Sequence, residues 1–266
     1  MKYKLICIDL DGTLLDDKKR ISEENIAAIR RASAQGVKIA IITGRMPGAT
    51  EFIAKQLQVP CILVCNAGTC IVEDKKCKSV EYMSADTMKN IYEIIKKFNV
   101  PLWIFRERQW FVTEMDSYIQ EEIDRVYCTP EIADVETLAR GWKRENTGPN
   151  KVLVSAEPEI IQAIYEELRK EQIQDVDMAC SADIFLEIFP KGINKGKALK
   201  IICDEMGISR EEVIAFGDQE LDISMLEAAG MGVAMGNAID ELKEKADFVT
   251  KTNNEAGIAY ALEHIK

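Results

Sequence analysis

Three short apolar runs in the first 65 residues limit the fold of this chain more than any other feature. These runs are too short for typical helices and almost free of polar residues; they are Leu5–Ile8, Val37–Ile42 and Pro60–Cys65. Such runs are expected for strands of a parallel sheet covered on both faces. Between the first two, an amphipathic segment follows the favourable N-cap Ser22 and stops at Gly36. This order predicts a doubly wound α/β domain.

The alternation is interrupted in the middle of the chain. Between about residues 84 and 189, helical and strand patterns follow one another without the earlier order. The α/β order then returns, with a predicted helix over Lys195–Met206 and a strand over Val213–Phe216. We therefore expect a Rossmann-like, doubly wound core domain formed by residues 1–83 and 190–266, with an α+β domain inserted at residues 84–189.

Aromatic residues lie on the two strands of a predicted hairpin in this inserted block. They are Trp103, Phe105, Trp110 and Phe111. Aromatic side chains at such positions are usually core residues. Stacking on a ring of a bound ligand is the alternative, and the sequence leaves both interpretations open.

Composition limits the partners of the chain. It has 266 residues with 34 basic and 45 acidic side chains, a net charge of -11, so we expect no nucleic-acid partner. No segment approaches the ~20 apolar residues of a membrane span, so we expect no membrane partner. Eight cysteines without a secretory signal indicate reduced thiols and a cytoplasmic protein. We expect a monomer or a homodimer.

Two carboxylates follow the first apolar run directly. Asp9 and Asp11 are spaced two apart, and Gly12 allows the chain to turn away from the strand. Placing two carboxylates together is costly unless a cation or a proton is shared between them. A hard divalent cation, Mg²⁺, is the simplest partner. The alternative is an ordinary polar turn, because Asp and Gly are common there.

Other polar residues stand where later strands end. Thr43 and Gly44 follow the second strand, Asp218 and then Asp222 follow the strand at 213–216, and Lys195 begins the returning helix. Ligands of open α/β sheets bind beyond the carboxyl ends of the strands. Taken singly, each of these residues has an ordinary structural interpretation, as a helix or turn cap or as a surface charge. Together they provide acidic groups for a cation and donors for an anion, which indicates phosphoryl transfer.

Four segments resemble the motifs of haloacid dehalogenase-type phosphatases. They are Asp9–Leu14, Thr43–Arg45, Asn194–Gly196 and Gly217–Asp218. The inserted block resembles the mobile cap domain of the Cof-type sugar phosphatase branch, and the resemblance covers nearly the whole chain.

The resemblance implies a Mg²⁺-dependent phosphatase that hydrolyses sugar phosphates or similar small phosphorylated metabolites through an aspartyl-phosphate. It implies Asp9 as the nucleophile and Asp11 as the general acid and base. It assigns phosphate binding to Leu10, Thr43, Gly44 and Lys195, and the metal to Asp9, Asp11 and Asp218. Asp222 would support the site by orienting Lys195 or the waters on the metal.

The fourth motif departs from its usual form, Gly-Asp-x-x-Asn-Asp. Leu221 replaces the asparagine, and the leucine side chain cannot form a hydrogen bond. Gln219, two positions earlier, is a candidate to compensate. Because of this departure, a weakly active phosphate-binding relative remains an alternative to an ordinary phosphatase. A second alternative, on the same scaffold, is a mutase-like enzyme that transfers phosphate between sugar hydroxyls.

Overall fold

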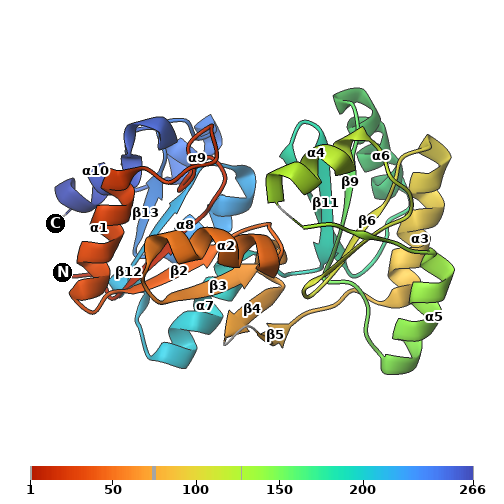
Figure 1. The fold of residues 1–266 in the computed structure, drawn as a ribbon, viewed down its shortest axis with the longest axis horizontal. Coiled ribbons are helices and arrows are strands. Elements are labelled where there is room, and N and C mark those ends of the chain that lie inside the picture. Colours follow the sequence, from red (N-terminus) through yellow and green to blue (C-terminus); the bar gives the residue numbers. More distant parts are fainter. Residues whose placement is uncertain (1, 74–75, 127, 266) are drawn as a thin grey trace. The chain divides into compact units, whose positions relative to one another are not determined.

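The computed structural model describes residues 2–73, 76–126 and 128–265. It divides into two compact units (Figure 1). The core unit comprises Met1–Lys78 and Asn194–Lys266, and the inserted unit comprises Ser79–Ile193.

The core unit is built on one sheet, with the strand order β14-β13-β12-β1-β2-β3-β4-β5 in the described residues. Neighbouring strands from β14 to β3 are parallel, whereas β4 runs antiparallel to β3. This confirms the predicted doubly wound α/β fold. The strands are β1 Leu5–Ile8, β2 Lys38–Ile42, β3 Cys61–Cys65, β4 Cys70–Glu73, β5 Lys76–Val80, β12 Val213–Gly217, β13 Met231–Ala234 and β14 Phe248–Val249.

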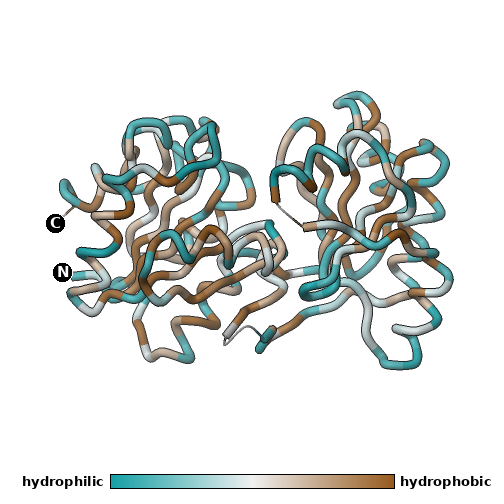
Figure 2. The backbone as a smooth tube through the Cα atoms, in the orientation of Figure 1, coloured by the Kyte–Doolittle hydropathy of each residue, from teal (hydrophilic) through white to brown (hydrophobic). Residues whose placement is uncertain are grey.

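Helices cover both faces of this sheet. Side chains alternate along β1, so that Ile6 and Ile8 pack on one face and Leu5 and Cys7 on the other. Figure 2 shows these strands as apolar segments inside the unit. The first face is covered by α1 Glu23–Ala34, α2 Pro47–Leu57 and α10 Gly257–His264, and the second by α7 Lys195–Met206, α8 Ile223–Ala228 and α9 Asp240–Lys245.

The inserted unit has its own mixed sheet, with the order β10-β11-β9-β6-β7-β8. Its strands are β6 Trp103–Arg106, β7 Gln109–Val112, β8 Glu131–Ile132, β9 Lys151–Ser155, β10 Val176–Ala182 and β11 Phe185–Pro190. Three helices pack on one face of it: α3 Ala85–Ile95, α5 Val135–Glu145 and α6 Pro158–Lys170. A further helix, α4, spans Ser117–Val126. In the described part of the chain, no helix combines the length and apolar character needed to cross a bilayer.

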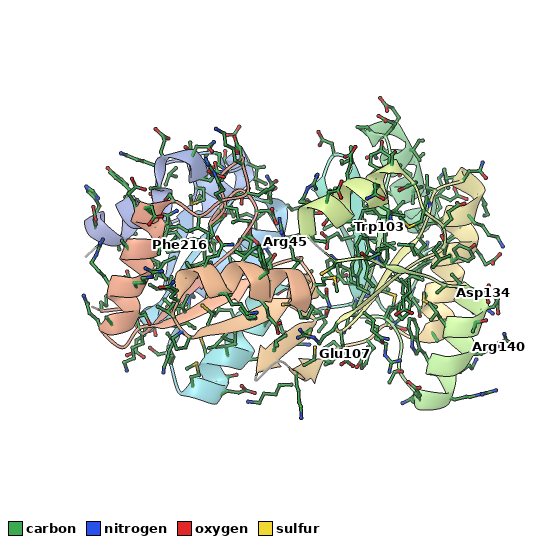
Figure 3. The ribbon with its side chains drawn as sticks, in the orientation of Figure 1. Arg45, Trp103, Glu107, Asp134, Arg140 and Phe216 are labelled. Atoms are coloured by element: carbon green, nitrogen blue, oxygen red, sulfur yellow. The ribbon has the colours of Figure 1, made fainter. Side chains whose placement is uncertain are left out.

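The hairpin aromatics are core residues of the inserted unit. Phe111 packs with the three helices. On the opposite face, the Trp110 ring lies 5.4 Å from that of Trp103 and 5.8 Å from that of Phe105, measured between ring centroids. Figure 3 shows Trp103 inside the unit, as Phe216 is inside the core unit. These mutual contacts favour packing over ligand stacking.

A buried ion pair joins two strands of the same sheet. Lys151 Nζ on β9 lies 2.9 Å from Glu187 Oε2 on β11, and their side chains are only 4% and 6% exposed. Removing one member of such a pair leaves the other charge buried and uncompensated.

We predict that Glu187→Gln lowers the free energy of unfolding by about 3 kcal/mol, because the buried Lys151 ammonium loses the carboxylate that offsets its charge. Urea denaturation followed by tryptophan fluorescence measures the loss, since all three tryptophans lie in this unit. The matched control is Glu136→Gln, which removes an exposed partner of Lys89 and should change little. Equal losses in the two variants would contradict the prediction.

Candidate active site

The predicted site residues meet at one edge of the core sheet. Asp9, Thr43 and Asp218 follow β1, β2 and β12, three adjacent parallel strands whose carboxyl ends lie together. Lys195 is the first residue of α7, directly after the N-cap Asn194. The four side chains come from separate parts of the sequence, and all are buried.

An acidic group lies at the centre of the site. Asp9, Asp218 and Asp222 each offer a carboxylate oxygen, and these oxygens lie within 4.8 Å of one another. Lys195 Nζ donates to Asp9 Oδ1 at 2.6 Å and also to Asp222 Oδ1. One ammonium compensates only one of the three carboxylates, so the group carries excess negative charge when all three are ionised.

Burial makes this charge unfavourable. It raises the pKa of Asp9 well above its usual value; Lys195 lowers that pKa, and the Asp222 and Asp218 charges raise it further. Burial and the charge of Asp222 likewise raise the pKa of Asp218 to about 6. For Lys195, burial acts to lower the pKa, but the Asp222 and Asp9 charges hold it above its usual range. The lysine therefore stays charged, and the site favours additional positive charge.

These residues fit a divalent cation. Carboxylate oxygens are the preferred ligands of Mg²⁺, and a divalent ion would offset the charge that Lys195 leaves uncompensated. Among the described residues, no other set of three His, Cys, Asp or Glu side chains comes together as closely. Asp218 is already oriented, since Thr13 Oγ1 donates to its Oδ1 at 2.7 Å and Gln219 Nε2 to its Oδ2 at 3.2 Å.

Gly12 allows the loop after β1 to approach Asp218. Its φ is +81°, and a Cβ at this position would lie 2.2 Å from Asp218 Oδ2. The Asn237 side chain donates to the Gly12 carbonyl at 2.8 Å. A side chain at position 12 is therefore excluded by both conformation and space.

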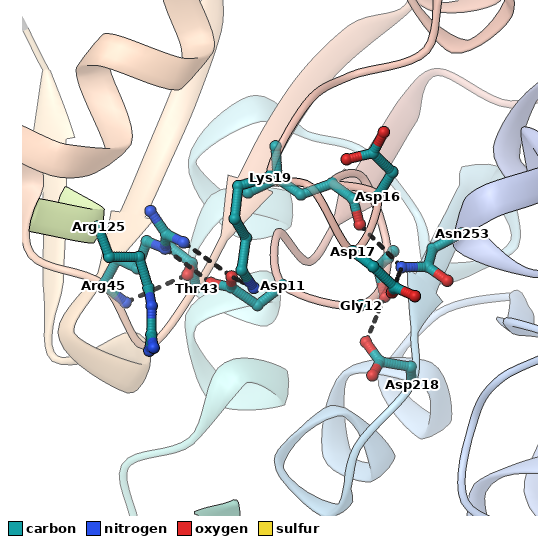
Figure 4. A network of polar contacts seen from close by, with 12 residues as sticks. Asp11, Gly12, Asp16, Asp17, Lys19, Thr43, Arg45, Arg125, Asp218 and Asn253 are labelled. Carbon is teal, nitrogen blue, oxygen red and sulfur yellow. Dashed lines mark hydrogen bonds and ion pairs between the residues drawn. The ribbon is translucent and has the colours of Figure 1, made fainter. Parts of the chain in front are cut away.

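Asp11 lies outside the acidic group. Arg45 binds both of its oxygens, each at 2.7 Å, and Lys19 Nζ donates to Oδ1 at 2.7 Å (Figure 4). Burial acts to raise the pKa of Asp11, but hydrogen bonds and charge from Arg45 and Lys19 hold it well below its usual range. The carboxylate is therefore ionised while these pairs persist.

The loop after β2 is fixed by its backbone. The Thr43 amide donates to the Val64 carbonyl at 2.9 Å, and Thr43 Oγ1 accepts from the Arg45 amide at 3.1 Å. In the loop after β1, Leu10 is fully buried, and its carbonyl accepts from the Leu15 amide at 2.9 Å. Thr43 and Leu10 are thus held in defined positions next to the strand ends.

Lys19 and Thr13 contact the site although sequence analysis gave them no role. Thr13 belongs to the first motif, and its hydroxyl, two residues after Asp11, is the sequence feature that could have indicated a role in the site. Lys19 follows a turn and has a φ of +59°. Its contact with Asp11 depends on that turn, and no spacing in the sequence indicates it.

Comparison with known proteins identifies the family of this chain. Residues 6–262 match the haloacid dehalogenase-like hydrolase family. The 5-amino-6-(5-phospho-D-ribitylamino)uracil phosphatase YcsE of Bacillus subtilis is 34% identical over 263 residues, 98% of this chain and 95% of that protein. A haloacid dehalogenase-like hydrolase from Bacteroides thetaiotaomicron superposes with a TM-score of 0.87 at 30% identity, covering 99% of this chain and 100% of that one. The subclass IIB sugar phosphatase BT4131 gives a TM-score of 0.83 at 26% identity, covering 98% of each chain.

The chain therefore belongs to the haloacid dehalogenase-like hydrolase family. Within that family it is a Cof-type phosphatase, a phosphoric monoester hydrolase that acts on small phosphorylated metabolites. The parallel core sheet with a separate mixed sheet is also the arrangement of the solved structures in this subfamily.

We predict that a divalent cation, tested as Mg²⁺, raises the thermal midpoint of the wild-type protein without substrate, because folding brings together the carboxylates that would hold it. At one hundred times its dissociation constant, a ligand stabilises by about 2.7 kcal/mol. Asp218→Asn should lose most of this gain, whereas Asp204→Asn, an exposed control on α7, should keep it. A full Mg²⁺ response in Asp218→Asn would refute a metal site at these carboxylates.

The raised pKa of Asp218 also predicts a pH effect in excess chelator. A carboxyl whose pKa is raised on folding contributes stability below its unfolded pKa of about 4 and loses it as pH rises through the folded value. With a folded pKa of about 6, wild type should lose about 3 kcal/mol relative to Asp218→Asn between pH 4 and 7. Urea denaturation at several pH values measures this difference, and a constant difference would contradict the assignment.

Proposed function

We propose that the enzyme cleaves phosphate monoesters through an aspartyl-phosphate formed on Asp9. The observation that carries this proposal is the buried Asp9 carboxylate at the end of β1, with Lys195 Nζ 2.6 Å from its Oδ1. A nucleophile needs a fixed orientation and neighbours that offset the charge of the incoming phosphate. Lys195 provides both.

In the first step, a carboxylate oxygen of Asp9 attacks phosphorus while the bond from phosphorus to the leaving oxygen breaks. Lys195, the Thr43 hydroxyl and the backbone amides of Leu10 and Gly44 would hold the phosphate oxygens. Mg²⁺, held by Asp9, the Asp11 carbonyl and Asp218, would supply charge neutralisation when bound. Asp222, which bonds Lys195 and accepts from the Asp218 amide at 2.9 Å, would keep the lysine aimed at Asp9.

Asp11 is proposed as the general acid and base. It would protonate the leaving oxygen and then remove a proton from the water that attacks the aspartyl-phosphate, which releases phosphate and restores Asp9. The ion pairs with Arg45 and Lys19 favour ionised Asp11. We propose that these pairs open when substrate binds, since a phosphate competes for the same cations.

The inserted unit is proposed as the cap that selects the leaving group and excludes water during reaction. A first candidate substrate is 5-amino-6-(5-phospho-D-ribitylamino)uracil, after the relative YcsE. We further propose that the enzyme works in the cytoplasm, where phosphorylated metabolites are retained because charged groups cross hydrocarbon at high cost.

The experiment that tests this function is Mg²⁺-dependent phosphate release. p-Nitrophenyl phosphate tests the chemistry, and a panel of sugar phosphates together with the uracil derivative tests the substrate class. Full turnover in excess chelator, or no release from any compound, would contradict the proposal.

Leu221 does not leave Asp218 without an amide partner. Gln219 Nε2 donates to Asp218 Oδ2 at 3.2 Å, and the Gln219 backbone amide donates to Asp222 Oδ2 at 3.0 Å. We propose that Gln219 takes over the orienting role of the usual asparagine, so that the departure from the family motif is compensated.

We predict that Asp9→Asn reduces kcat by at least ~10³-fold, a little over 4 kcal/mol of barrier, because an amide is a poor nucleophile. The shape of the side chain is nearly unchanged, so circular dichroism should show an intact fold. Turnover within tenfold of wild type would rule Asp9 out as the nucleophile.

We predict that Gln219→Leu lowers kcat/KM about tenfold, since a hydrogen bond to a charged group contributes ~1.5–3 kcal/mol. Leu221→Asn should change kcat/KM less than about threefold, because the role is already filled. Steady-state kinetics on p-nitrophenyl phosphate compares the two. A clear gain in Leu221→Asn with no loss in Gln219→Leu would show that the departure weakens the enzyme.

A further inference from the structure

The turn between β3 and β4 has an unusual backbone. Asn66, Ala67 and Gly68 follow one another with φ values of +51°, +60° and +101°. Asn and Gly adopt this left-handed region readily, but Ala does so rarely. Ala67 is also buried, so the conformation is held inside the protein. Strained backbone of this kind persists only where surrounding contacts enforce it.

One side of the turn binds the loop after β2. The Asn66 amide donates to the Arg45 carbonyl at 2.9 Å, and the Ala67 amide donates to the Thr43 carbonyl at 3.0 Å. The β3 strand itself supplies no residue to the proposed chemistry. Its turn nevertheless fixes the backbone on both sides of Gly44.

The other side of the turn lies against the start of α7. A Cβ at position 68 would lie 2.8 Å from the Asn194 carbonyl oxygen and 3.4 Å from the Lys195 amide nitrogen. Only a glycine permits this approach without a shift of one backbone. The same turn therefore touches the segments that carry Thr43 and Lys195.

We infer that Asn66–Gly68 is a positioning element that sets the separation of Thr43 and Lys195, and with it the width of the phosphate site. The inference rests on the proposed function, which places both residues on phosphate. An ordinary hairpin turn would need only to reverse the chain. This turn also contacts the loop that carries Thr43 and the start of α7, which carries Lys195. The successive amides of Asn66 and Ala67 both donate to that loop.

Gly68→Ala tests the inference, with Gly36→Ala as its control. Gly36 has a similar φ of +87°, but in the described structure no atom lies within 4 Å of a Cβ built there. Both variants strain the backbone, and only Gly68→Ala presses on Asn194. We expect Gly68→Ala to raise both KM for p-nitrophenyl phosphate and the inhibition constant of inorganic phosphate at least tenfold. The rise in thermal midpoint with Mg²⁺ should be kept, and Gly36→Ala should stay within twofold of wild type.

Equal kinetics in Gly68→Ala and Gly36→Ala would overturn the inference. Parallel loss of phosphate and Mg²⁺ responses would also overturn it, since that indicates general damage to the site. If the wild-type protein shows no phosphatase activity, the proposed function fails. Calorimetric binding of inorganic phosphate in the presence of Mg²⁺ still compares the two glycine variants in that case.

A second pair of variants serves if Gly68→Ala does not fold. Thr69 Oγ1 donates to the Asn66 carbonyl at 2.8 Å and closes the turn. Thr69→Val removes this bond with little change of shape, and Thr69→Ser retains it. We expect weaker phosphate binding in Thr69→Val and recovery in Thr69→Ser. Unchanged phosphate binding in Thr69→Val would refute the positioning role.

Discussion

The bridge that Lys195 forms between Asp9 and Asp222 is the interaction on which the site depends. Three buried carboxylates within a few ångströms would repel one another and resist burial. The ammonium makes their burial tolerable and holds Asp9 in one orientation. It also joins the end of β1 to the segment after β12 through the start of α7. The same contact therefore supports the packing of the core unit and prepares its proposed nucleophile.

Local sequence signals were sufficient for much of the core unit. Ser22 caps α1 as expected, and α7 spans Lys195–Met206 with Gly207 at its end in a left-handed conformation. These elements carry caps and a regular apolar period, which depend on neighbours in sequence. The convergence of Asp9, Thr43 and Asp218 also followed from the sequence, because strand ends in a parallel sheet lie together.

Contacts between distant segments were beyond such signals. The pairing of Asp11 with Arg45 and Lys19 sets the charge state of the proposed acid, yet it depends on how two loops meet. The amide of Gln219 lies beside Asp218 because of the short turn after β12. β9 is a buried strand that contains Lys151. From sequence alone a lysine indicates an exposed position, and only its partner Glu187 explains the burial. Each case is decided by a partner that sequence spacing does not reveal.

The insertion also has a consequence for synthesis of the protein. Asp9 is synthesised before its partner Lys195, which follows 186 residues later, after the whole inserted unit. At 5–20 residues per second, the ribosome needs roughly ten to forty seconds to cover that distance. During this interval the nascent chain carries the nucleophile without the cation that makes its burial favourable. The inserted unit, Ser79–Ile193, is contiguous in sequence and complete before Lys195 is added, whereas the core unit and its chemistry need the segment that begins at Asn194.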